Sequence, residues 1–199
     1  MSIAKTRQTL LEVARELFAR KGLEATTMND IAQASQRGRR TLYTYFRNKE
    51  EIYYAVIENE LERLSEKMDK VAAMDIEPEE KVLTLIYTHL QVIKETVARN
   101  GNLRAEFFRN IWKVEQVRKA FDREEQDIIS RVLREGVERH KFNIDNIGLM
   151  TDIIHYVMKG LEVPYIYDRL GHVLTEEESI PMVMRVIRGA LGYCADETK

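Results

Sequence analysis

The residues with the most informative chemistry lie between Thr26 and Glu51. In this stretch Arg37, Arg39 and Arg40 gather at the start of a short segment with a helical pattern. An arginine fork can pair with two acceptors on a guanine edge in the major groove, and threonine and tyrosine hydroxyls suit phosphate oxygens. The hydroxyls that accompany the arginines belong to Thr41, Tyr43 and Thr44. These residue types predict a surface that binds double-stranded DNA.

Two short helices joined by a tight turn would hold this surface. Thr27 to Asp30 is a capping box, in which each side chain accepts from the other residue's backbone amide, so a helix begins at Thr27 and should end between residues 33 and 35. The second helix is expected from Arg39 to Phe46, with Leu42 and Phe46 buried together. Its amino-terminal end is the end that enters the groove in a helix-turn-helix. Gly38 suits either a left-handed turn position or the cap of this second helix.

This stretch resembles the amino-terminal signature of the TetR family of transcriptional regulators. The matching segments are Gly22 to Thr27, Ile31-Ala32, Thr41 to Phe46 and Lys49-Glu50. The resemblance covers about the first quarter of the chain and implies a DNA-binding head followed by a helical ligand-binding domain. It also implies contacts with the DNA backbone from Thr27, Thr41, Tyr43, Tyr45 and Lys49. The positions that the resemblance places near base edges are Asn29, Arg39 and Arg40.

The turn departs from the family pattern, and the charge distribution supports a DNA-binding head. Where the family usually has Ala-Gly-Val-Ser, this chain has Ser35-Gln36-Arg37-Gly38, so Arg37 replaces a buried valine. An arginine that points outward there would strengthen phosphate binding.

The charge distribution divides the chain into two parts. Residues 1–50 hold ten basic and five acidic residues, whereas the rest of the chain holds 21 basic and 28 acidic ones. A basic head on an acidic body is typical of a protein that meets DNA with one end.

The remaining sequence predicts an all-α protein. Apolar residues recur at three- and four-residue spacing, glycine and proline are sparse, and no strand-like alternation stands out. We expect a helix-turn-helix DNA-binding domain over residues 1–48 and a helical effector-binding and dimerisation domain over residues 49–199. About nine helices are expected. Besides the two short ones, they lie near residues 2–20, 49–73, 77–100, 103–114, 116–139, 145–168 and 176–194.

The larger domain contains aromatic and polarizable residues that could line an apolar pocket, where a few polar groups would orient a small ligand. The pocket candidates are Tyr87, Phe107, Phe108, Trp112, His155, Tyr156 and Met158. Each of them could equally be an ordinary core residue. The TetR resemblance favours a pocket, because members of the family bind effectors in this domain, but it does not identify the effector.

Two late apolar helix faces are wide enough to pack against a second copy of the chain. Their residues are Ile153, Ile154, Val157, Leu161, Val183, Val186, Ile187 and Ala190. Two such helices meeting their copies would form a four-helix bundle across a two-fold axis, although both could instead pack inside their own chain. Two recognition helices on one duplex need a spacing of about 34–36 Å, which favours a homodimer. The family resemblance places the interface on these helices.

Other classes of protein fit less well. The histidines are scattered without metal-ligand spacing, and no glycine-rich phosphate loop or G-x-S-x-G motif is present, so we expect no enzyme, no cofactor and no metal. A helical enzyme or carrier, with Cys194 and His172 as its reactive pair, is one alternative, and a non-specific architectural DNA-binding protein is another. No apolar run is long enough for a membrane span, and no secretory signal is present, which favours a cytoplasmic protein. The preferred prediction is a homodimeric repressor that leaves its palindromic DNA operator when a small-molecule effector binds.

Overall fold

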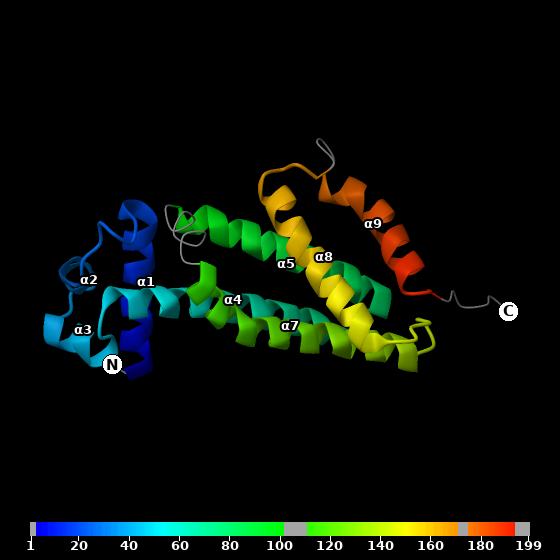
Figure 1. Cartoon of the computed structure of the whole chain (residues 1–199), viewed down its shortest axis with the longest axis horizontal. Helices are drawn as coiled ribbons and strands as arrows, with labels where there is room; N and C mark the ends of the chain where they lie inside the picture. The colour runs from blue at the N-terminus through cyan, green and yellow to red at the C-terminus, as the bar shows by residue number, and fades with distance from the viewer. Residues whose placement is uncertain (1–2, 102–110, 171–174, 194–199) are drawn as a thin grey trace. The chain divides into compact units, whose positions relative to one another are not determined.

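The computed structural model describes residues 3–101, 111–170 and 175–193, apart from the side chains of residues 111–117 and 176. Within these ranges the chain forms α-helices and no β-strand, which confirms the predicted all-α class (Figure 1). None of the described helices is both long enough and apolar enough to span a membrane. The helices are α1 (Ile3–Lys21), α2 (Met28–Ala34), α3 (Arg39–Tyr45), α4 (Lys49–Ala72), α5 (Pro78–Asn100), α7 (Ile111–Glu138), α8 (Ile147–Ile166) and α9 (Glu176–Ala190).

The largest departure from the expected helix boundaries lies between residues 114 and 116, and the last helix, expected to reach residue 194, ends at Ala190. A break was expected after residue 114, but α7 runs without interruption from Ile111 to Glu138. The expected break was wrong because Lys113 to Gln116 contains no glycine, proline or capping residue that would end a helix. The rest of the helix expected over residues 103–114 lies outside the described residues. At the other end, α9 closes before Gly192, which adopts the left-handed conformation (φ 56°) that commonly follows a helix.

The chain divides into two compact units by its internal contacts. Unit 1 comprises residues 1–63 and 95–120, and unit 2 comprises residues 64–94 and 121–199. Helices α4, α5 and α7 therefore each contribute residues to both units. The domain boundary predicted after residue 48 was drawn between a DNA-binding and a ligand-binding part. It does not coincide with the division into these two contact units, and it stays a prediction.

The core of unit 1 joins α1 to the two short helices and the start of α4 (Figure 1). Leu42 is fully buried and Phe46 is 3% exposed, so the apolar pair predicted for the second short helix faces inward. The Phe18 ring meets the Tyr53 ring edge-on at a centroid distance of 6.3 Å. Each such buried side chain contributes about 1.5–3 kcal/mol relative to an exposed one, and together they fix the position of α3. Other buried members are Leu10, Leu11, Ala14, Leu17, Ile31 and Ile52.

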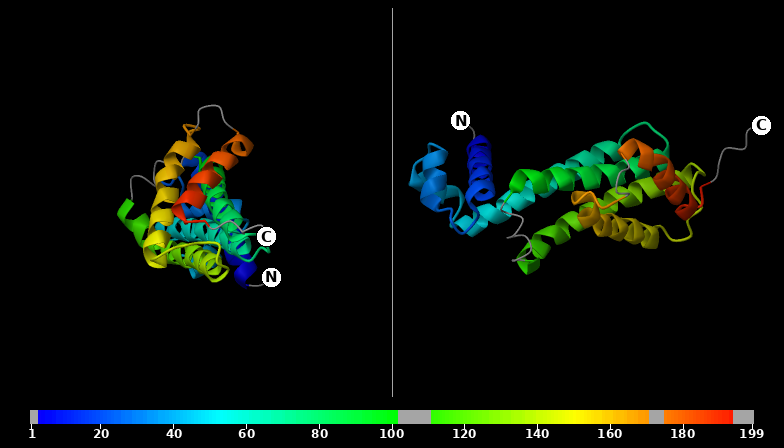
Figure 2. Two further views of the ribbon diagram at one scale, coloured as in Figure 1. Left: turned by 90° about the vertical axis from the view of Figure 1, so that its right-hand side faces the viewer. Right: turned by 90° about the horizontal axis from the view of Figure 1, so that it is seen from above.

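In unit 2, hydrogen bonds place both α8 and α9 against α5. The Tyr87 hydroxyl on α5 lies 2.6 Å from the Ser179 hydroxyl on α9, and the Tyr165 hydroxyl on α8 donates to Gln91 at 3.2 Å. Lys81 on α5 donates to the Glu135 carboxylate on α7 at 2.7 Å. Figure 2 shows these helices gathered in two further views. The apolar core between them includes Met68, Val82, Leu85, Ile128, Ile129, Val132 and Leu133.

Candidate nucleic-acid interface and the helical ligand domain

Helix α2 begins with the capping box that the sequence predicted. The Thr27 hydroxyl accepts from the Asp30 amide at 3.1 Å, and the Asp30 carboxylate accepts from the Thr27 amide at 2.9 Å. This backbone hydrogen bond holds the pKa of Asp30 below its usual value, because it favours the charged carboxylate. Thr27 and Asn29, both predicted to contact DNA, are exposed on this first turn. A fixed first turn keeps both side chains in defined positions.

The turn between α2 and α3 has a glutamine, rather than a glycine, in its left-handed position. Gln36 carries the left-handed conformation, with φ 54°. Gly38 has φ −64° and ψ 146° and caps α3 without a side-chain hydrogen bond. Of the two roles considered for Gly38, the cap is the one observed. The residue in the strained conformation is therefore a glutamine, at the position where the family usually has glycine.

Helix α3 presents its polar residues away from the core. Arg39 and Arg40 are exposed at its amino-terminal end, Tyr43 is 46% exposed, and Arg37 just before the helix is half-buried. The Thr44 hydroxyl is exposed but donates to the Arg40 carbonyl at 2.9 Å, so it is already engaged within the helix. The remaining predicted contacts on α3, which are half-buried, are Thr41 and Tyr45.

Lys49, at the start of α4, has a structural role that the sequence did not indicate. Its ammonium donates to the backbone carbonyls of Leu23 at 3.0 Å and Glu24 at 3.2 Å. It also lies 3.8 Å from the Glu24 carboxylate. These contacts tie the first turn of α4 to the segment between α1 and α2. Lys49 therefore stabilises the head whether or not it also touches DNA.

A second connection in unit 1 joins α1 to the end of α5. Arg15 is buried and donates to the Glu12 carboxylate at 2.5 Å and to the Arg99 carbonyl at 3.4 Å. The hydrogen bond from Arg15 lowers the pKa of Glu12 despite partial burial. Just beyond α5, a Cβ added at Gly101 would lie 2.8 Å from the Ala19 carbonyl oxygen. This close approach requires glycine, so α1 packs directly on the end of α5.

Comparison with known proteins agrees with this geometry. Residues 10–56, which span α2, α3 and most of the described core around them, match the model of the bacterial regulatory proteins of the tetR family. The amino-terminal part of the chain is a TetR-family DNA-binding domain. An uncharacterized helix-turn-helix transcriptional regulator, YfiR of Bacillus subtilis, is 28% identical over 145 residues, which cover 69% of this chain and 68% of YfiR. The regulator AcrR of Shigella flexneri is 27% identical over 169 residues, which cover 78% of this chain and 74% of AcrR.

The fold of the whole chain also matches a solved structure. A TetR/AcrR-family regulator from Thermobifida fusca superposes with a TM-score of 0.70 at 23% identity, covering 96% of this chain and all of that one. This likeness extends the family's fold beyond the amino-terminal match. Because the proteins that it resembles are transcriptional regulators, this chain is a DNA-binding transcriptional regulator and not an enzyme.

The described residues that were predicted for a ligand pocket do not line one common cavity. Tyr87 lines a cavity of about 420 Å³ in unit 2. Tyr156 is 66% exposed and Met158 is fully buried, and neither lines this cavity. Phe107 and Phe108, and the side chain of Trp112, lie outside the described residues. Around the cavity, residues from α4, α5 and α9 include Val71, Leu83, Val92, Ile180, Lys70 and Thr84.

The fold brings together buried charged residues that are far apart in the sequence. His89 on α5 donates to the Glu125 carboxylate on α7 at 2.5 Å and lies 3.1 Å from the Glu162 carboxylate on α8. His155 on α8 lies 2.7 Å from the other oxygen of Glu125. Sequence reasoning placed His155 in an apolar pocket and treated the histidines as scattered, and it missed Glu125. The one available signal was that Glu125 lies four residues after buried Phe121, on the apolar face of α7.

The electrostatics of this group follow from its burial and its contacts. Burial alone would lower the pKa of His89, but its hydrogen bonds to Glu125 and Glu162 outweigh this and raise it to about 9. Burial alone would raise the pKa of Glu125, but its contacts with His155 and His89 lower it to about 2. At neutral pH, His89 is therefore an imidazolium and Glu125 a carboxylate.

The helix faces predicted for dimerisation are largely open. On α8, Ile153 is 47% exposed and Val157 is 51% exposed, while Val186 on α9 is 71% exposed. Ile187 is buried within its own chain, so it serves the core rather than an outer face. Among the other predicted interface residues, Ala190 is exposed, and the half-buried ones are Ile154, Leu161 and Val183.

Proposed function

We propose that this protein is a homodimeric repressor that binds a palindromic operator and leaves it when a small molecule binds its helical domain. The observation that carries the proposal is the pair of exposed arginines, Arg39 and Arg40, at the amino-terminal end of α3. In helix-turn-helix proteins, this end reaches the base edges, and arginine reads guanine there. Thr27, Tyr43 and Lys49 would supply phosphate contacts on either side.

The exposed apolar faces of α8 and α9 support a dimer. Ile153, Val157 and Val186 each leave about half or more of their surface open to solvent. Neighbouring exposed residues extend this surface to Leu149, Tyr156, Val163 and Met182. An apolar patch of this kind on a soluble protein marks a protein–protein contact. An isologous contact across a two-fold axis would carry two copies of α3 to successive major grooves of a palindromic site.

The cavity in unit 2 supports an effector. Its volume of about 420 Å³ falls within the range of small-molecule sites, and it is open to solvent, with polar residues such as Lys70, Thr88 and Gln91 beside the apolar ones. A ligand that binds better to a conformation with badly spaced heads would weaken operator binding by its differential affinity for the two states. The size of that effect is limited to the difference between these affinities.

Selection of bound duplexes from a random DNA pool tests the proposal. We expect a palindrome with half-sites about one helical turn apart, recovered at about 0.15 M salt, where non-specific attraction is partly screened. The selected duplex then serves as the probe for small molecules that release the protein. Binding without sequence enrichment would refute sequence-specific repression and favour a non-specific architectural protein. Enrichment of a single half-site by a monomer would refute the dimeric form of the proposal.

A further inference from the structure

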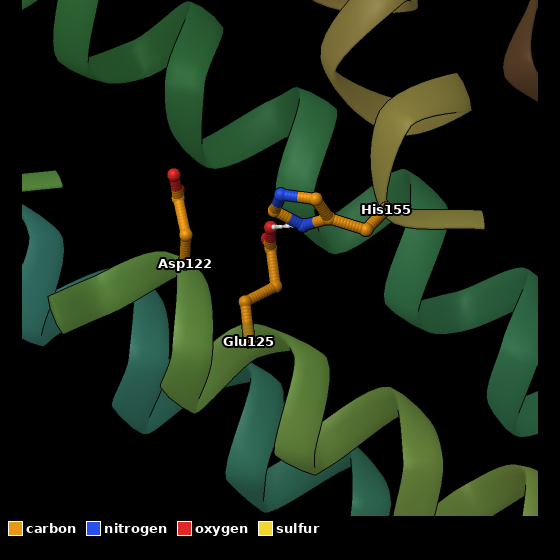
Figure 3. Close-up of side chains that lie close together, drawn as sticks. All are labelled: Asp122, Glu125 and His155. Carbon is orange, nitrogen blue, oxygen red and sulfur yellow. Dashed lines mark ion pairs between the residues drawn. The ribbon is translucent and has the colours of Figure 1, made fainter. Parts of the chain in front are cut away.

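We infer that Asp122, Glu125 and His155 form a binding site for a divalent transition-metal ion. One potential ligand atom from each residue lies within 4.8 Å of those from the other two. Figure 3 shows Asp122 and Glu125 projecting from α7, one turn apart, with the His155 ring reaching them from α8. Glu125 and His155 are buried and Asp122 is half-buried, so all three are held inside unit 2 rather than on a mobile surface.

Two buried atoms at the centre of this group face each other. The Oε2 atom of Glu125 and the Nδ1 atom of His155 form an ion pair at 2.7 Å, which Figure 3 marks with a dashed line. A divalent ion would bind both atoms in place of the proton between them, because metal ligands bind in their deprotonated form.

The residues around the three donors leave oxygens free for an ion. His89 donates to Oε1 of Glu125, so that Oε2 faces His155, and Glu162 in turn holds the His89 ring. Lys159 donates to Oδ1 of Asp122 at 2.5 Å, which leaves Oδ2 available. Outer hydrogen bonds of this kind orient the ligands of metal sites and fix which atom faces the ion.

The donor set indicates the class of metal. One imidazole nitrogen with two carboxylate oxygens suits divalent zinc, cobalt, nickel, manganese or iron. The absence of thiolate or thioether donors among these three residues argues against copper(I), and calcium prefers six to eight oxygen ligands. Three protein ligands leave at least one coordination position for water or a small molecule.

Calorimetric titration of chelator-treated full-length protein with Zn²⁺ tests the site, and the absorption bands of bound Co²⁺ report its coordination. We expect one ion per chain, and at least a tenfold weaker affinity in His155→Gln and Glu125→Gln. The matched controls are His140→Asn, which changes an exposed histidine whose left-handed conformation (φ 57°) asparagine tolerates, and Asp127→Asn, which changes an exposed carboxylate on α7. Both controls should bind as the wild type does.

Three results would overturn the inference: no bound ion, binding undiminished in His155→Gln, or binding lost in His140→Asn. Circular dichroism of each variant shows whether it is folded. If Glu125→Gln unfolds because His89 loses its partner, His155→Gln still decides the question. The titration involves no DNA, so its outcome is independent of the proposed repressor function.

Discussion

Replacing Gln36 by glycine should stabilise this protein, because Gln36 holds a left-handed backbone conformation (φ 54°) in the turn between α2 and α3. A residue with a Cβ loses about 1–2 kcal/mol in this conformation, whereas glycine loses almost nothing. Glycine also gains freedom in the unfolded chain, which offsets about 0.4–1 kcal/mol of the benefit. The net stabilisation should be about 0.5–1 kcal/mol. For a chain of 199 residues, this corresponds to a rise in melting temperature of about 1–4 °C.

Thermal unfolding followed by circular dichroism measures this change, and a second glutamine provides the control. Gln33 is also exposed but lies within α2, where glycine costs about 0.5–1 kcal/mol. Gln36→Gly should therefore raise the melting temperature and Gln33→Gly should lower it. Gln36→Ala separates strain from side-chain loss, because alanine keeps the Cβ and should not stabilise. The reasoning fails if Gln36→Gly is as destabilising as Gln33→Gly.

The remaining predictions concern DNA binding, pH and assembly. Arg40→Ala should cost about 1–3 kcal/mol on the selected operator and little on random duplex, measured by titration of both. Lys49→Ala should weaken binding to both duplexes alike and also lower the melting temperature, because its bonds to the Leu23 and Glu24 carbonyls are lost; a thermal midpoint equal to the wild type would contradict that structural role. The folded-state pKa of Asp30 is lowered, so the Asp30 carboxylate should contribute its full stability above its unfolded pKa of 3.8. This contribution should be lost as the pH falls through the folded-state pKa. The melting temperature of Asp30→Ala should therefore lack this part of the dependence on acid pH. Val157→Asp should shift the dimer toward monomer in sedimentation velocity, and an unchanged sedimentation coefficient would place the interface elsewhere.

Sequence reasoning succeeded where the determining interactions are local. The capping box of α2 joins residues three positions apart, so its donors and acceptors can be read from the chain order. The burial of Leu42 and Phe46 follows in the same way from their four-residue spacing. The left-handed residue of the turn could not be assigned, because the sequence offered a glycine two positions later and local propensity favours glycine.

The buried charged group shows why the rest was out of reach. His89 and Glu125 are 36 positions apart, and His89 and Glu162 are 73 apart, so no spacing rule connects them. Only the packing of α5, α7 and α8 brings them together. A histidine or carboxylate on an apolar helix face could have signalled a buried polar group, but not its partner. The second role of Lys49 was hidden for the same reason, since its acceptors are carbonyls 25 and 26 positions earlier.

Helix α4 runs from the helix-turn-helix to the cavity, so the proposed ligand response can pass along this one helix. Its first residue, Lys49, is hydrogen-bonded to the segment that leads into α2, and near its other end Val71 lines the cavity. No glycine or proline interrupts the helix between these positions. Sharp kinks in helices arise almost always at such residues or at local defects. A ligand that moves this part of the cavity wall therefore acts on the same helix whose first residue is anchored beside the helix-turn-helix.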